Sequence, residues 1–395
     1  MPHDRKHLVV LGLGGLSLNL ATALAATGRL PNLARLLTVN ATAIDAELPA
    51  VAPVNRASLL TAASPGRHGI FGFTVMEPAL YVPVPLGPKA IRVPTLPDRL
   101  AEAGLTAICI DPPAPSGAQA PDQPPAIDAL ARELGASLAA RRHVLAGEAG
   151  GDAWDMLFLA LPETGAIFRW FHDAVTVPEH SAHASVINIL TDWDRTLGAA
   201  LDRYDALPGP KRLLAVADHG VAELLTEVDC NAWLAAKGLL GTALREDGSV
   251  RILPHQTAAF ALDSGRICIN AKERFARGVF HEHVASNLTG ELREALLALS
   301  FEGRPVMETV LAADDFADGP LPAGAPDLVC VGAAGMALTA RYDRKEVFGR
   351  FGATGCASPH GALFCDTEAA RPARMREVGA AIARFFQLPD MEERA

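Results

Sequence analysis

The sequence lacks three features that would assign it to a functional class directly. Its six cysteines form no Cys-x-x-Cys pair, so neither a zinc ribbon nor a redox dithiol is predicted. It has no excess of basic residues, since the formal net charge is −10, and this disfavours nucleic-acid binding, which needs a basic face. No apolar run approaches the roughly 20 residues that cross a membrane, so no membrane association is predicted.

The N-terminal segment also lacks a targeting signal. Glycines interrupt its apolar run after a few residues, and no cleavage-site pattern follows. The scattered cysteines are most simply interpreted as reduced thiols. We therefore expect a cytoplasmic protein, and the sequence leaves its oligomeric state open.

Short apolar runs alternate with helical patterns along much of the chain. Half of the 395 residues are hydrophobic, which suffices for a large core. Continuous apolar runs are typical of strands buried on both faces, and helices between them favour a parallel sheet. The sequence therefore predicts an α/β fold with a mostly parallel sheet. Its expected strands are residues 7–13, 105–111, 155–161 and 212–218, and its expected helices include 17–27, 96–103, 126–142 and 184–204.

Two segments interrupt this alternation. Residues 111–125 are rich in proline and predict a surface connection, with an active-site lid as the alternative. The composition shifts after residue 228, which predicts an inserted cap subdomain over 229–320. The core would then consist of residues 1–228 and 321–395.

Polar residues follow several of the predicted strands. The stretch "LLAVADHGVAEL" places Asp218, His219 and Gly220 directly after an apolar run, and "LGLGG" and "LPETG" follow two others. A fourth segment, "SPHG" (358–361), lies in a glycine-rich loop. Ligands of open α/β sheets bind beyond the carboxyl ends of the strands, so we expect these residues around one cleft. A carboxylate beside an imidazole suits a divalent metal, although an Asp that caps the next helix explains it equally.

Ordered matches over most of the chain resemble one superfamily. The matching stretches are "GRLPNLARLL" (28–37), "NRASLLTAASPGRHGIFGF" (55–73), "ADHG" (217–220), "VDCNAWLAAKGLL" (228–240), "GRICINAKERFARG" (265–278), "APDLV" (325–329) and "PHG" (359–361). They are similar to the alkaline phosphatase superfamily, specifically its type I phosphodiesterase and nucleotide pyrophosphatase-like branch. The resemblance implies an alkaline-phosphatase-like α/β/α sandwich with a mostly parallel central sheet and a cap insertion.

The resemblance also implies a mechanism whose parts are incomplete here. The family uses two zinc-like ions, held by Asp and His residues, around an attacking Thr or Ser. The first family aspartate falls on Gly14, and the nucleophile falls on Ala52. No Ser or Thr occurs from Ala43 to Ala57, so a shifted register does not restore a nucleophile.

The family's Asp-x-x-x-His pair falls on Glu163 and Ile167, and the isoleucine cannot bind metal. The matching positions are Asp218, His219 and His360, with Glu163 as a conservative variant. Gly14 and Ile167 each remove a ligand from one of the two metal sites, and Ala52 removes the attacking hydroxyl. These losses disfavour two-metal phosphoester hydrolysis.

We therefore expect a repurposed enzyme acting on a small, anionic substrate. Glu163, His219 and His360 would be its acid–base groups, and together with Asp218 they would hold at most one Zn or Mn ion. Asn55 and Arg56 would contact the anion beside the helix N–H groups, with Ala52 and Gly14 lining the site. Alternatives remain open: a non-catalytic pseudoenzyme that binds a ligand or partner, or a metal-dependent phosphodiesterase. Asn55 as a helix cap and Arg56 as a solvated side chain are equally compatible with the pattern.

Three further residues have simpler interpretations. His68 in "GRHGI" is expected to be a structural histidine in the turn that leaves a helix. Cys356 is expected to be a buried thiol rather than a nucleophile that pairs with His360. Arg169 is expected to have a surface or packing role.

Overall fold

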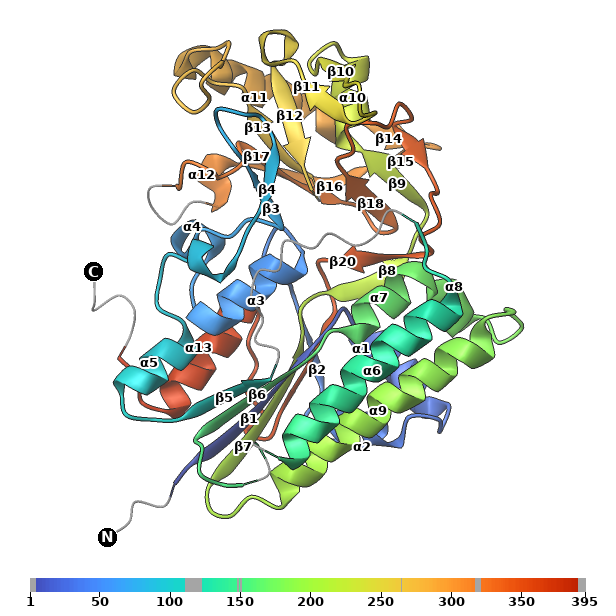
Figure 1. Cartoon of the computed structure of the whole chain (residues 1–395), viewed down its shortest axis with the longest axis vertical. Coiled ribbons are helices and arrows are strands. Elements are labelled where there is room, and N and C mark those ends of the chain that lie inside the picture. Colours follow the sequence, from blue (N-terminus) through green and yellow to red (C-terminus); the bar gives the residue numbers. More distant parts are fainter. Residues whose placement is uncertain are drawn as a thin grey trace.

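Six strands form the central sheet, in the spatial order β2 (Thr42–Ile44), β21 (Ala362–Asp366), β7 (Lys211–Ala217), β1 (His7–Leu13), β6 (Met156–Leu161) and β5 (Ala107–Ile110). This sheet lies in the lower part of Figure 1. The computed structural model describes residues 5–110, 123–147, 149, 151–263, 265–316 and 321–389. Strand β1 pairs in parallel with β6 and β7, and β5 continues in parallel beyond β6. Among the described strands of this sheet, β21 alone runs against the others, through antiparallel pairs with β2 and β7, so the predicted mostly parallel sheet is confirmed.

Helices cover both faces of this sheet, which explains why its strands are continuous apolar runs. Every residue of β6 is buried, and the sheet forms the largest hydrophobic core. Figure 1 shows one helical layer on each side. One layer contains α1 (Leu18–Ala26), α2 (Pro31–Leu37), α6 (Ile127–Ala146) and α9 (His183–Asp205), and the other contains α3 (Ala52–Thr61), α5 (Leu96–Glu102) and α13 (Met375–Phe385). The four predicted helices correspond to α1, α5, α6 and α9.

A second, smaller sheet forms a separate lobe at the top of Figure 1. Its strands are β12 (Ala259–Leu262), β13 (Arg266–Ile269), β17 (Leu328–Gly332) and β16 (Met307–Ala312), in this order. Together with α10 (Cys230–Ala236) and α11 (Glu282–Leu297), it encloses its own hydrophobic cluster. The domain boundary expected at residue 320 falls between two neighbouring strands, β16 and β17, so the division of the chain stays a prediction.

Shorter elements connect the two lobes and shape the space between them. A three-stranded sheet joins β18 (Met336–Thr339), β9 (Thr226–Asp229) and β19 (Phe348–Gly349), and β8 (Gly220–Glu223) pairs with β20 (Gly355–Ser358). The hairpins are β3–β4 (Thr74–Met76, Pro83–Pro85), β10–β11 (Thr242–Leu244, Val250–Ile252) and β14–β15 (Ser300–Phe301, Arg304–Pro305). The remaining short helices are α4 (Pro65–His68), α7 (Glu163–Trp170), α8 (His172–Thr176) and α12 (Ala313–Phe316).

His68 is the last residue of α4 and contacts Ser58 of α3; it was expected to be a structural histidine in the turn that leaves a helix. Its Nδ1 accepts a hydrogen bond from the backbone N–H of Ile70, so Nε2 carries the proton and donates to Ser58 Oγ at 2.9 Å. Complete burial lowers the pKa of His68 to about 3. The ring is therefore neutral and structural at physiological pH.

Two further predictions concern the proline-rich segment and membrane-spanning helices. Most of the proline-rich segment, residues 111–122, lies outside the described residues. Among the residues that are described, none of the helices has the length and apolar composition needed to cross a membrane.

Candidate functional site

A cavity of about 280 Å³ lies where the loops after the central strands meet the second lobe. Hydrogen bonds hold these loops together: Gly14 N donates to the carbonyl of Leu161, and Asp218 N donates to that of Leu13. The volume is near the lower end of the ~300–1,000 Å³ typical of small-molecule sites. The lining residues come from α3, α7, β8, β18 and β20, from the segments next to them, and from the segments next to β3 and β12. They include Ala52, Phe168, Arg169, His219, Leu338 and Arg341.

Ala52 places a methyl group on the wall of this cavity. It is the first residue of α3, whose N-terminal turn has no side-chain cap. The position that the resemblance assigns to the nucleophile therefore does face the cleft, but it offers no hydroxyl. A covalent phosphoryl intermediate on this residue is excluded.

Gly14 lies in a loop with no room for a side chain. A Cβ at this position would lie 2.5 Å from the carbonyl oxygen of Pro162 and 2.9 Å from the amide nitrogen of Gly165. The neighbouring Gly15 leaves space for the His219 ring, which a Cβ there would overlap. Gly14 thus permits the close packing of the loops after β1 and β6, and does not line the cavity.

Asp218, His219 and Arg56 form one cluster beside the cavity. Arg56 Nη2 lies 3.4 Å from Asp218 Oδ2, and His219 Nε2 lies 3.5 Å from Asp218 Oδ1. His219 Nδ1 lies 2.8 Å from the carbonyl oxygen of Gly220 and therefore donates to it. The carboxylate is buried, so its charge is balanced by the guanidinium within a poorly solvated space.

Glu163 forms a separate, buried ion pair with Arg141 of α6. The distance from Arg141 Nη1 to Glu163 Oε1 is 2.5 Å, and Arg141 Nε donates to the carbonyl of Ala160. The adjacent Ile167 belongs to the hydrophobic core and is fully buried. Glu163 therefore contacts α6, and the structure does not bring it together with His219 or His360.

His360 bridges the two lobes. Its Nδ1 lies 3.0 Å from Asp45 Oδ1, next to β2, and its Nε2 lies 2.8 Å from Glu308 Oε1 of β16. Glu308 and, secondarily, Asp45 raise the pKa of His360 by accepting these hydrogen bonds. Both ring nitrogens are therefore engaged away from Asp218 and His219.

Asn55 supports the loop that precedes α3. Its Oδ1 accepts from the backbone N–H of Glu47, and its Nδ2 donates to the carbonyls of Glu47 and Val51. The side chain is completely buried, with its amide directed at backbone groups. Asn55 thereby positions Ala52 and Arg56, which lie on the same helix, α3.

The side chains present do not fit a cation held by the four expected ligands. Asp218 is paired with Arg56, Glu163 with Arg141, and His360 with two other carboxylates. In the part of the chain that the structure describes, no group of three or more His, Cys, Asp or Glu side chains is arranged to hold a metal ion.

Sequence reasoning missed several residues of the cleft. Arg169 of α7 and Arg341 after β18 both line the cavity, as does Asp263, which Arg266 neutralises through bonds of 3.0 and 2.7 Å. Arg169 packs over the Trp170 ring, in line with the packing role expected for it, and its position on the cavity wall is the part that the sequence did not indicate. Cys356 also lines the cavity, but burial raises the pKa of its thiol to about 11, so it is protonated at neutral pH.

The order of the strands, the helical layers and the cleft at the strand ends define an alkaline-phosphatase-like protein. Phosphonoacetate hydrolase from Sinorhizobium meliloti, solved with phosphonoacetate, has a TM-score of 0.62 and 16% sequence identity over 97% of this chain and 96% of that one. Human ectonucleotide pyrophosphatase/phosphodiesterase 5 has a TM-score of 0.59 and 11% identity over 98% and 96%. The mouse form, in an inactive variant with AMP, has a TM-score of 0.57 and 12% identity over 97% and 96%.

The model of the type I phosphodiesterase / nucleotide pyrophosphatase family matches residues 8–356, and the chain belongs to this family. No curated protein sequence matches it significantly. Membership supports a phosphoester-related function and confirms the resemblance drawn from the sequence.

Proposed function

We propose that this protein is a repurposed member of its family, in which the cleft binds a small anionic molecule and His219 transfers a proton to or from it. The observation that carries the proposal is that His219 and Ala52 both line the wall of one cavity. An imidazole suited to acid–base catalysis is retained, while the position of the nucleophile is a methyl group.

The contacts of His219 define how it would act. Because Nδ1–H donates to the Gly220 carbonyl, Nε2 is the ring nitrogen that exchanges the proton. Asp218 lies beside Nε2 and stabilises the ring when that nitrogen is protonated. Arg56 balances the negative charge of Asp218 and fixes the orientation of its carboxylate. Asp218 and Arg56 are thus positioning residues in this proposal.

The charges around the cavity support an anionic ligand. Arg169 and Arg341 bring two guanidinium groups to its wall, of which Arg341 is paired with the exposed Asp343, and the carboxylate of Asp263 in the same wall is matched by Arg266. The uncapped N-terminal turn of α3 adds partial positive charge at Ala52. The two similar structures with phosphonoacetate and with AMP also hold anionic molecules.

The proposal assigns no catalytic role to Glu163 and His360, and it includes a cytoplasmic location. Glu163 and His360 take no part in the chemistry, because each is engaged in its own ion pairs. The six cysteines are all unpaired, which supports our proposal of a reducing, cytoplasmic location.

A non-catalytic binding module is the second candidate, and the Arg56–Asp218 pair favours it. An ion pair that neutralises a former metal ligand preserves the shape of the cleft without requiring chemistry. The cleft is open in either case, since the fully buried Ile167 does not line it.

A screen for ligand binding and turnover separates these candidates. Small carboxylates, phosphonates and phosphate mono- and diesters would be tested for a shift in melting temperature, and the ligands that bind would be followed by NMR for conversion. The repurposed enzyme predicts conversion that falls by ~10²–10⁴-fold in His219→Gln, as expected for loss of a general acid–base. The exposed His255→Gln variant is the matched control. Binding without conversion of any ligand would support the binding module instead.

A further inference from the structure

Arg341 stands between two hollows of the cleft. It lines the 280 Å³ cavity described above, here called the inner cavity, and also an adjoining groove of about 450 Å³, here called the outer groove. The outer groove lies between the β3–β4 hairpin and the turn at residues 248–250, and its lining includes Thr74, Pro83, Ser249 and Asp343. The residues that line both hollows are Asp263, Ala340 and Arg341, so a molecule that spans them would lie beside this boundary.

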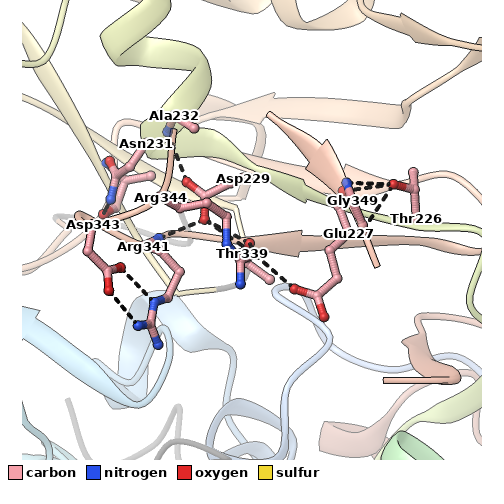
Figure 2. A network of polar contacts seen from close by, with 11 residues as sticks. Thr226, Glu227, Asp229, Asn231, Ala232, Thr339, Arg341, Asp343, Arg344 and Gly349 are labelled. Atoms are coloured by element: carbon pink, nitrogen blue, oxygen red, sulfur yellow. Dashed lines mark hydrogen bonds and ion pairs between the residues drawn. The ribbon is translucent and has the colours of Figure 1, made fainter. Parts of the chain in front are cut away.

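The guanidinium of Arg341 is held by a carboxylate of its own segment. Nε donates to Asp343 Oδ1 at 3.0 Å, and Nη2 donates to Asp343 Oδ2 at 2.9 Å, as Figure 2 shows. This two-bond geometry is the one by which arginine binds carboxylate and phosphoryl groups of ligands. The Asp343 side chain is 55% exposed, so it can leave Arg341 for solvent.

The backbone that carries Arg341 is fixed by buried groups. Asp229 Oδ2 accepts from Arg341 N at 2.8 Å and from Thr339 Oγ1 at 2.9 Å, while its Oδ1 accepts from Ala232 N at the start of α10 (Figure 2). Asp229 is 1% exposed. Arg341 therefore keeps its position when its side chain changes partner.

A second anchor follows three residues later. Arg344 pairs with the buried Glu227 at 3.0 Å, as Figure 2 also shows, and its guanidinium lies 3.4 Å from the centre of the Phe351 ring. The segment from Thr339 to Arg344 is thus held at both ends. Such a fixed segment presents the Arg341 side chain in a pre-organised position for a ligand.

The lining of the inner cavity indicates which chemical group the anionic ligand carries. The cavity lining includes several apolar side chains, among them Val51, Phe73, Phe168 and Leu338. A compact aryl or alkyl group fits this surface, and its burial contributes affinity roughly in proportion to the apolar area covered.

We propose that Asp343 is an internal competitor that occupies Arg341 in the free protein, and that the two-oxygen anionic group of an aryl or alkyl ligand displaces it. The inference deepens the proposed function, because it names the ligand class and the residue that selects it. The shared chemistry is a carboxylate or a phosphoryl group, and displacement costs little because an exposed ion pair contributes little stability.

Isothermal titration with phenyl phosphate, benzoate and neutral benzyl alcohol tests this inference. We expect one or both anions to bind and the alcohol to bind at least tenfold more weakly. The stronger of the two anions identifies phosphoryl or carboxylate as the recognised group. Arg341→Gln should weaken anion binding about tenfold or more, consistent with loss of charge-assisted hydrogen bonds. Asp343→Asn should strengthen it about two- to fivefold, because the competing charge is gone.

The control variant is Arg304→Gln, an exposed arginine of β15 that lines neither hollow, and its affinity should equal that of the wild type. Unchanged melting temperatures would show that all variants are folded. If the anions bind but Asp343→Asn leaves or weakens their affinity, or Arg341→Gln leaves it unchanged, this inference is overturned and the proposed anion site stands. If neither anion binds the wild type at millimolar concentration, both are overturned.

Discussion

Arg56 Nη2 lies 3.4 Å from Asp218 Oδ2, so a guanidinium of the chain balances the charge of a carboxylate that relatives are expected to use for metal binding. Arg141 has the same relationship to Glu163, at 2.5 Å. Asp218 and Glu163 thus have arginine partners from different helices, α3 and α6. The cleft can therefore keep its shape without added cations.

Metal removal is predicted to leave stability unchanged. A cation that binds only the folded state at 100 times its Kd would add about 2.7 kcal/mol, and several degrees to the melting temperature. Because both expected carboxylate ligands, Asp218 and Glu163, are already paired with arginines, we expect a change below about 1 °C after dialysis against a chelator or addition of zinc. Calorimetry checks this. A zinc-dependent increase of several degrees that Asp218→Asn abolishes would contradict it.

Glu163→Gln is predicted to destabilise the fold strongly. The substitution leaves Arg141 buried without its countercharge, and breaking a buried pair in this way costs about 3–5 kcal/mol. Urea unfolding measures the loss. The matched control is Arg195→Gln, which breaks an exposed pair with Asp192 and should cost less than about 1 kcal/mol. Equal losses in both variants would show that the burial of the first pair is unimportant.

Gly14→Ala is predicted to destabilise the protein by about 1–3 kcal/mol, because its Cβ would meet the backbone of Pro162. For the same reason, Gly14→Asp would not rebuild a metal site. Gly135→Ala in α6 is the control, since a Cβ there meets nothing within 4 Å and should stabilise the helix by roughly 0.5–1 kcal/mol. A Gly14→Ala variant as stable as the wild type would show that the loop has room for a side chain at this position.

His68 makes stability decrease in acid. Its pKa in the folded protein is about 3, below the ordinary value of 6.5, so the unfolded chain takes up the proton first. The contribution of the neutral His68 ring to the free energy of unfolding should be fully present above pH 6.5. It should decline as the pH falls toward 3, by roughly 2–3 kcal/mol between pH 7 and pH 4.5. Urea unfolding at both values checks this. The decline should shrink by that amount in His68→Gln but persist in His255→Gln.

The sequence predicted the framework better than the charges inside it. Strands β1, β6 and β7 follow from their continuous apolar runs, and the ordered family motifs placed Ala52 and His219 at one cleft. The partner of Glu163 did not follow, because Arg141 lies 22 residues away on another helix and looks like any other arginine of a helical pattern.

Tertiary packing also decided where His360 points. Its partners Asp45 and Glu308 lie 315 and 52 residues away in the sequence, so only the meeting of the two lobes brings them together. Arg341 was missed for a similar reason, since its place on the cavity wall depends on the second lobe. The local motif of a residue predicts its position near the strand ends, whereas its partner depends on elements far along the chain.

Steady-state hydrolysis of aryl phosphate mono- and diesters, with zinc or manganese added, tests the central claim most directly. A methyl group at Ala52 and carboxylates paired with Arg56 and Arg141 predict no metal-dependent turnover above the uncatalysed rate, in the wild type and in Asp218→Ala alike. Metal-dependent turnover by the wild type that Asp218→Ala abolishes would contradict the account.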